Sequence, residues 1–254
     1  MKTVLFAATT AVLSTCQPQD QGPDLETPAA ITAQDVQLLT YAAKDLPYQA
    51  MDVGTRLLDG ACPVRTSVSG GTQLTGGCTD AFGNSFAGTA VVSETFGAGT
   101  VDTSVKFSHF KLSNGKGDFE MDGTFKEAIG STTTERHFDG EIIVSGTFFG
   151  DTYVYDNFSD EIESQGSFEN RYIQGEFDAE IYGHVEVDAA YSQMTGCNNI
   201  PHVLPMNGTF NLYTDGGDVA YDIQPPCQSM VPFSGDVAGM SLWNMGYEDG
   251  WLQF

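Results

Sequence analysis

The feature of this chain that most limits its fold is a two-residue alternation of apolar and polar side chains. Its clearest stretch is residues 176–188, where acidic side chains dominate one set of alternate positions. The other set is apolar or small and consists of Phe177, Ala179, Ile181, Gly183, Val185 and Val187. Because successive side chains of a strand point to opposite faces of a sheet, the pattern predicts one long strand with a buried and a wet face.

Similar alternation occurs in residues 101–112, 118–125 and 219–223, and turn-forming Gly, Asn and Asp residues punctuate the chain from Cys62 onward. Strands of ordinary length would number about ten to twelve in this part of the chain. We therefore predict an all-β fold, an antiparallel meander that forms a sandwich, a barrel or a large curved sheet.

One short helix is expected before the strands. Thr32 can cap the amide of Asp35, and Pro47 ends the helical pattern. Its apolar face would carry Val36, Leu39, Ala43 and Leu46. The sequence thus predicts a single amphipathic helix that packs against the β-rich part.

A short motif, Gly-x-Phe in which x is Thr, Ser or Glu, recurs at irregular intervals. It occurs at Gly123-Thr124-Phe125, Gly146-Thr147-Phe148, Gly166-Ser167-Phe168, Gly175-Glu176-Phe177 and Gly208-Thr209-Phe210. Irregular spacing argues against a solenoid or propeller. We expect each glycine to relieve crowding or mark a bulge on a curved sheet, with the phenylalanine in the core.

The cysteines indicate an oxidising compartment. Apart from Cys16, the chain has an even set of four. Three pairings are open, and the nearest-neighbour one, Cys62 with Cys78 and Cys197 with Cys227, is favoured because each pair brackets a short segment. The four histidines have no zinc-ligand spacing, so no metal is expected from them.

The charge balance limits the partners. The chain has 34 acidic and 10 basic residues, a net charge of −24. Such a surface repels nucleic acid and anionic lipid head groups, and it attracts divalent cations or basic partners. Negative charge also keeps an exported protein soluble.

The first residues have the pattern of an export signal. Residues 4–13 carry no charge and are too few to span a bilayer as a helix. The sequence Leu13-Ser14-Thr15-Cys16 resembles the lipobox of bacterial lipoproteins, from which it departs at Thr15. The resemblance implies that Cys16 is acylated and begins the mature chain, and that Gln17 favours the outer membrane.

This resemblance divides the chain into a signal peptide (1–15), a lipid-anchored flexible tether (16–31) and a single β-rich domain with its helix (32–254). The expected product is an exported outer-membrane lipoprotein that faces the periplasm or the cell surface. We expect a binding or structural module rather than an enzyme, with a protein, glycan or cation as its ligand.

The sequence offers one candidate site for a cofactor, a calcium ion. Asp80 and Asn84 lie in a Gly-rich turn, and their oxygens would suit Ca²⁺. Asx side chains that bond their own turn backbone account for the same residues, and no full calcium-loop spacing is present.

Two alternative functions remain open. The segment Glu176-Phe177-Asp178-Ala179-Glu180 resembles the Glu-x-Asp-x-Glu strand of jelly-roll glycoside hydrolases that cut β-glucans. The resemblance implies Glu176 as nucleophile, Asp178 as its modulator and Glu180 as acid/base, with the two glutamates converging in a groove. The C-terminal Trp251-Leu252-Gln253-Phe254 prompts the other alternative, an outer-membrane β-barrel.

Overall fold

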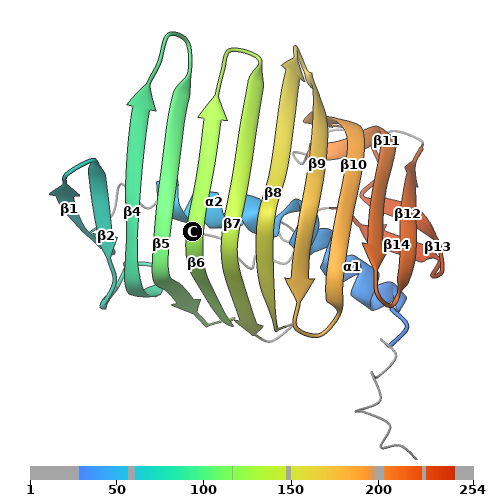
Figure 1. Cartoon of the computed structure of the whole chain (residues 1–254), viewed down its shortest axis with the longest axis horizontal. Coiled ribbons are helices and arrows are strands. Elements are labelled where there is room, and N and C mark those ends of the chain that lie inside the picture. Colours follow the sequence, from blue (N-terminus) through green and yellow to red (C-terminus); the bar gives the residue numbers. More distant parts are fainter. Residues whose placement is uncertain are drawn as a thin grey trace, which may run out of the picture.

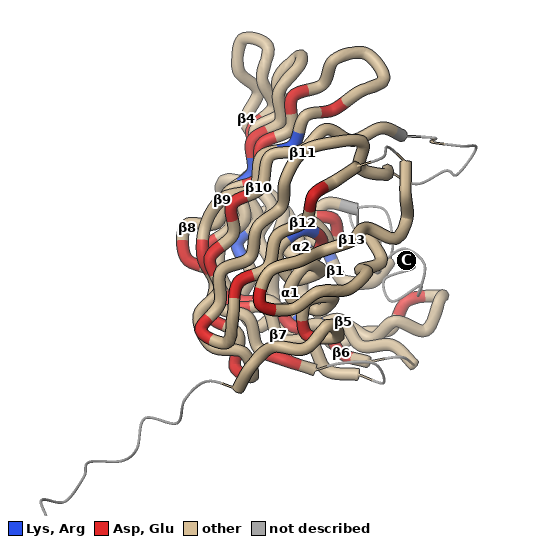
Figure 2. The backbone as a smooth tube through the Cα atoms, turned by 90° about the vertical axis from the view of Figure 1, so that its right-hand side faces the viewer, with Lys and Arg blue, Asp and Glu red and all other residues tan. Residues whose placement is uncertain are grey.

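The computed structural model describes residues 29–56, 61–115, 117–146, 150–195, 197, 203–224 and 227–243. Its strands form one 14-stranded sheet, and two helices run across one face of that sheet (Figure 1). Seen from the side, the sheet curves around the helices (Figure 2). Of the three all-β arrangements predicted, the structure has the large curved sheet.

The sheet is an antiparallel meander, as predicted, and its order follows the sequence except that β3 pairs only with β4. The strands are β1 (Val64–Val68), β2 (Gly71–Thr75), β3 (Cys78–Thr79), β4 (Ser85–Phe96), β5 (Val101–Asn114), β6 (Gly117–Ile129), β7 (Thr133–Gly146), β8 (Asp151–Gln165), β9 (Phe168–Ala179), β10 (Gly183–Thr195), β11 (Val203–Thr214), β12 (Gly217–Ile223), β13 (Met230–Gly235) and β14 (Gly239–Leu242).

The N-terminal region holds two helices, α1 (Ala33–Lys44) and α2 (Leu46–Arg56), where the sequence predicted one. The Thr32 cap is confirmed, because its hydroxyl accepts from the Asp35 amide at 3.4 Å and the Asp35 carboxylate accepts from the Thr32 amide at 2.7 Å. The second helix was missed because Pro47 was interpreted as a terminator. Pro47 lies in the first turn of α2, where a missing N–H is tolerated.

The core lies between the helices and the face of the sheet that they cover, here called the inner face. It is rich in aromatic side chains, which include Phe107, Phe110, Phe125, Phe138, Phe177, Phe210 and Trp243. The Tyr155 hydroxyl donates to the Ala42 carbonyl at 2.9 Å and thereby ties β8 to α1. The opposite, outer face carries the polar half of the alternation.

The prediction that residues 176–188 form one long strand is wrong, because these residues form a hairpin. Strand β9 ends at Ala179 and β10 begins at Gly183, which has a φ of 77°. The alternation does not reveal the turn because both strands keep their apolar residues on the inner face, where Phe177 pairs with Val185. The turn residues 180–182 also lack the usual Gly, Asn or Pro signature.

A line of left-handed residues, here called the crease, crosses the six neighbouring strands β4–β9. One residue of each strand belongs to it: Gly88, His109, Gly123, Gly140, Asn157 and Gly175. Gly123 and Gly140 lie directly opposite each other, and a Cβ on Gly123 would lie 2.5 Å from the Gly140 Cα. The strands approach so closely here that only glycine fits.

Two aspartates hold the non-glycine residues of the crease. The Asp122 carboxylate accepts from the His109 amide at 3.0 Å, and the Asp139 carboxylate accepts from the Asn157 amide at 2.6 Å. The register of the sheet shifts at the bulges of β5 and β8, the two strands that contain His109 and Asn157. The aspartates therefore satisfy amides that these bulges remove from the ladder.

The prediction for the Gly-x-Phe motif is confirmed at three of its five sites. Gly123, Gly175 and Gly208 have positive φ, and the phenylalanines two positions later are buried. Gly166 instead lies in the β8–β9 turn, and its Phe168 is exposed. The motif at 146–148 extends beyond the described residues.

The predicted cysteine pairs form disulfides. Cys62 and Cys78 have an S–S distance of 1.99 Å, and Cys197 and Cys227 one of 2.08 Å. The first bond links the segment before β1 to β3. Within the described ranges, no helix combines the length and the hydropathy that a bilayer crossing requires.

Candidate binding groove

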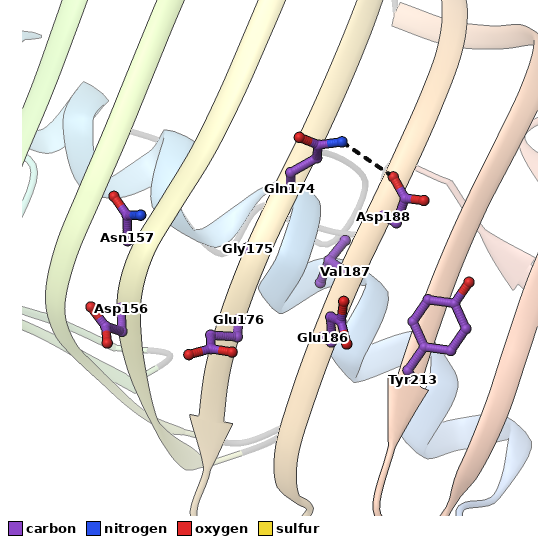
Figure 3. Close-up of a pocket in the computed structure, with 9 residues that line it drawn as sticks. All are labelled: Asp156, Asn157, Gln174, Gly175, Glu176, Glu186, Val187, Asp188 and Tyr213. Carbon is purple, nitrogen blue, oxygen red and sulfur yellow. Dashed lines mark hydrogen bonds between the residues drawn. The ribbon is translucent and has the colours of Figure 1, made fainter.

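An open groove of about 840 Å³ lies on the outer face, over strands β8–β11 (Figure 3). It is lined by Asp156, Asn157, Gln174, Gly175, Glu176, Glu186, Val187, Asp188 and Tyr213. Two of these, Asn157 and Gly175, belong to the crease. The groove therefore lies where the sheet bends.

The register of the sheet aligns four of the lining side chains in one row across the strands. Asp156 is opposite Glu176, Glu176 is opposite Glu186, and Glu186 is opposite Tyr213. We call the three acids Asp156, Glu176 and Glu186 the carboxylate row. Side chains directly opposite on neighbouring strands have Cβ atoms about 4.5–5.5 Å apart, so the row is a continuous line of negative charge.

No lysine or arginine ion pair in the described part of the chain reaches the carboxylate row. Like charges directly opposite each other in a sheet are destabilising. Glu176 is 52% exposed and in contact with solvent, which limits this repulsion. The row is nevertheless an arrangement that folding alone does not favour.

Three of the basic residues instead lie beneath the sheet: Lys44 and Arg171 are buried, and the Arg136 side chain is 12% exposed. Arg171 donates to the Asp160 carboxylate at 2.8 Å and to the Lys44 carbonyl at 2.6 Å. Arg136 donates to Glu127 at 2.7 Å and to Asp160 at 3.2 Å. These cations neutralise acids of the interior.

The basic side chains beneath the sheet are therefore separated from the acids of the outer face. Desolvation lowers the pKa of Lys44 although Asp45, 2.6 Å from its ammonium, acts to raise it. Figure 2 shows acidic residues along the strands of the outer layer and few basic ones among them. The outer face keeps a charge that the interior cations do not offset.

His184 lies beside the groove, in contact with Glu176 of its lining. Its Nδ1 is 3.0 Å from the Asp178 Oδ1, and its Nε2 is 3.6 Å from the Glu176 Oε2. The hydrogen bond to Asp178 raises the pKa of His184, with smaller contributions from the charges of Asp178 and Glu176. When protonated, His184 reduces the negative charge beside Glu176, the middle acid of the carboxylate row.

The structure does not bring together the three acids of the hydrolase-like segment. Glu176 lines the groove, and Asp178 lies outside the lining against His184. Glu180 lies in the β9–β10 turn, where its carboxylate accepts from the Thr152 hydroxyl at 3.2 Å. Glu176 therefore has Asp156 and Glu186, not Glu180, as its acidic neighbours across the strands.

In the turn that holds Asp80 and Asn84, the Asp80 carboxylate accepts hydrogen bonds from groups of the same turn. The Asp80 carboxylate accepts from the amides of Phe82 and Asn84 and from the Asn84 side chain, at 2.8–2.9 Å. Slight burial acts to raise the pKa of Asp80, but the hydrogen bonds from Asn84 and Phe82 bring it below its usual value. Across the described residues, no cluster of three or more His, Cys, Asp or Glu is arranged to hold a metal.

Sequence reasoning identified Glu176 and missed the other acids of the groove. The alternation correctly placed Glu186 and Asp188 on a wet face. It could not show that Asp156 of β8 lies opposite Glu176, because register between separate strands is not encoded by a two-residue period. Cys16 and Phe254 lie outside the described residues.

No protein-family model matches the chain, and no similar curated protein or solved structure was found.

Proposed function

We propose that this protein is an exported, lipid-anchored binding module whose outer groove receives a positively charged peptide segment of a partner protein. The carboxylate row is the observation that carries the proposal. Three acids lie directly opposite one another, and no lysine or arginine of the described residues forms an ion pair with them. A bound cationic chain would supply the missing charges.

The energetics of the row favour such a ligand. Directly opposed like charges destabilise a sheet, and a ligand that neutralises the row removes this cost. A groove lined by acids also accelerates the encounter with an oppositely charged partner.

The shape of the groove favours a peptide over a metal ion. A calcium ion needs six to eight oxygens converging at about 2.3–2.6 Å, whereas the carboxylate row spreads over three strands about 4.8 Å apart. Tyr213, at the end of the row, is 41% exposed and offers a ring face to a lysine or arginine side chain. A volume of about 840 Å³ accommodates several side chains.

Export and anchoring are the other half of the proposal. The two disulfides are the observation that favours an oxidising compartment. Acylation of Cys16 would hold the domain at a membrane through the Pro- and Gln-rich tether. Metabolic labelling with palmitate should mark the wild-type chain and leave the Cys16→Ser variant unmarked; equal labelling of both would contradict the anchor.

Calorimetric titration of the purified protein with tetralysine tests the groove. We expect binding that weakens steeply with added salt and that is lost in the double variant Glu176→Gln/Glu186→Gln. The matched control is Glu135→Gln/Glu161→Gln, which removes another directly opposed glutamate pair of the outer face, outside the groove. Equal loss in both double variants, or no heat with wild-type protein, would refute the proposal.

A parallel titration with Ca²⁺ distinguishes the ligand classes. The proposal predicts no saturable Ca²⁺ binding that depends on Glu176 and Glu186. Stoichiometric Ca²⁺ binding abolished by the same double variant would assign the groove to a cation instead.

A further inference from the structure

The start of the domain and several turns lie at the same end of the strands. In an antiparallel meander alternate turns lie at the same edge, so the β5–β6, β9–β10 and β11–β12 turns do so here (Figure 1). The β3–β4 turn joins them because Ser85 pairs with Ser113 near the end of β5. Ile31 is also there, since its amide donates to the Gly216 carbonyl in the β11–β12 turn at 3.3 Å. We call this end of the strands, defined by these four turns and Ile31, the tether edge; the opposite edge is the other end of the strands.

Two large apolar side chains project from turns of the tether edge. Phe82, in the β3–β4 turn, is 82% exposed, and Ile181, in the β9–β10 turn, is 65% exposed. Both backbones are held in place, because the Phe82 amide donates to Asp80 at 2.8 Å and the Ile181 amide donates to Asp151 at 3.2 Å. The turns therefore present these side chains to solvent from backbone positions that hydrogen bonds hold.

The chain that leads to the anchor reaches the domain at this edge. Twelve residues, 17–28, separate Cys16 from Ala29. As a flexible coil they would span about 20 Å on average, whereas strands of 12–15 residues run for about 40–50 Å. A membrane that holds Cys16 is thus nearer to the tether edge than to the opposite edge, which carries Phe96.

We propose that the tether edge docks on the lipid bilayer, with Phe82 and Ile181 inserted at its surface. This inference rests on the proposed acylation of Cys16 for its orientation. Because the net charge is −24, the bilayer surface that suits this edge is zwitterionic rather than anionic. The strands then stand up from the membrane, and the groove on the outer face stays open to a soluble partner.

Tryptophan fluorescence on vesicles tests the docking without relying on acylation. A hexahistidine tag in front of Gln17 replaces the acyl chain and attaches the protein to phosphatidylcholine vesicles that contain a nickel-chelating lipid. Phe82→Trp and Ile181→Trp each report on one turn, and Phe96→Trp, at an exposed site of the opposite edge, is the matched control. The parent protein gives the background of Trp243 and Trp251.

We expect the added tryptophan of Phe82→Trp and Ile181→Trp to shift its emission to the blue on vesicles and to be quenched by brominated acyl chains, and that of Phe96→Trp to do neither. Vesicles rich in phosphatidylglycerol should reduce both signals. Unchanged emission from both tether-edge variants on vesicle-bound protein, or equal quenching of Phe96→Trp, would overturn the docking. A blue shift without vesicles that rises with protein concentration would assign the edge to self-association instead. Palmitate labelling of Cys16 tests the proposed anchor independently of this docking experiment.

Discussion

At the scale of single residues, the fold depends on backbone conformations that few side chains allow. The crease places six left-handed residues on neighbouring strands, and four of them are glycines. The two exceptions, His109 and Asn157, have amides held by aspartates of an adjacent strand. The bend of the sheet is therefore determined by particular residues and not by general flexibility.

Gly123→Ala should be strongly destabilising. Its φ of 126° is unfavourable for alanine, and the new Cβ would lie 2.5 Å from the Gly140 Cα. We expect a loss of about 1–3 kcal/mol or more in the free energy of unfolding, measured by urea denaturation. Gly115→Ala is the control, because no atom lies within 4 Å of its Cβ position, and it should be close to neutral. Similar midpoints for both variants would contradict the role of the crease.

His184 should titrate above its ordinary value of 6.5, because Asp178 accepts a hydrogen bond from its protonated ring. The raised pKa means that the pair stabilises the fold at low pH and that this contribution is lost as the pH rises through the folded-state pKa. Asp178→Asn should lower the pKa of His184, measured by NMR of the ring protons. A pKa unaffected by this substitution would show that the contact is absent in solution.

At the scale of secondary-structure elements, a buried ionic network joins α1 to the sheet. Asp160 of β8 accepts from Arg136 of β7 and Arg171 of β9, and Arg171 also donates to the end of α1. Desolvation acts to lower the pKa of Arg171, but the charge of Asp160 and its hydrogen bond, together with other nearby groups, raise that pKa above its ordinary value. Removing one partner of such a network leaves a buried charge without compensation.

Asp160→Asn should therefore cost about 3–5 kcal/mol in the free energy of unfolding. Asp102→Asn, at an exposed position of β5, should change it by less than about 0.5 kcal/mol. Urea denaturation of both variants provides the comparison. A small effect at Asp160 would mean that water compensates the two arginines.

The elements also show what sequence patterns can predict. The two-residue period identified the strands and their wet faces, and the Thr32 capping pattern located α1. The period did not locate the turn between Ala179 and Gly183, since an apolar position on either side of a tight hairpin continues the alternation. The groove was beyond prediction for a related reason: it depends on the pairing of Asp156 with Glu176, which long-range packing decides.

At the scale of the whole molecule, the fold separates charge: Lys44 and Arg171 are buried, Arg136 lies largely shielded beneath the sheet, and acids remain on the outer face. His184 is placed to modulate the charge of the groove, because its protonation puts a positive charge 3.6 Å from Glu176. Binding of tetralysine should weaken as the pH falls through the pKa of His184, in calorimetric titrations at constant ionic strength. Affinity that stays constant or rises over this range would contradict the electrostatic account.

The central claim, that the outer groove binds a positively charged peptide, is tested most directly by two-dimensional amide NMR of the protein titrated with tetralysine. We predict that the largest shift changes fall on Asp156, Glu176, Glu186 and Asp188, and that the amides of the tether edge stay in place. Changes spread evenly over the acidic residues of the outer face, or centred away from the carboxylate row, would contradict the claim.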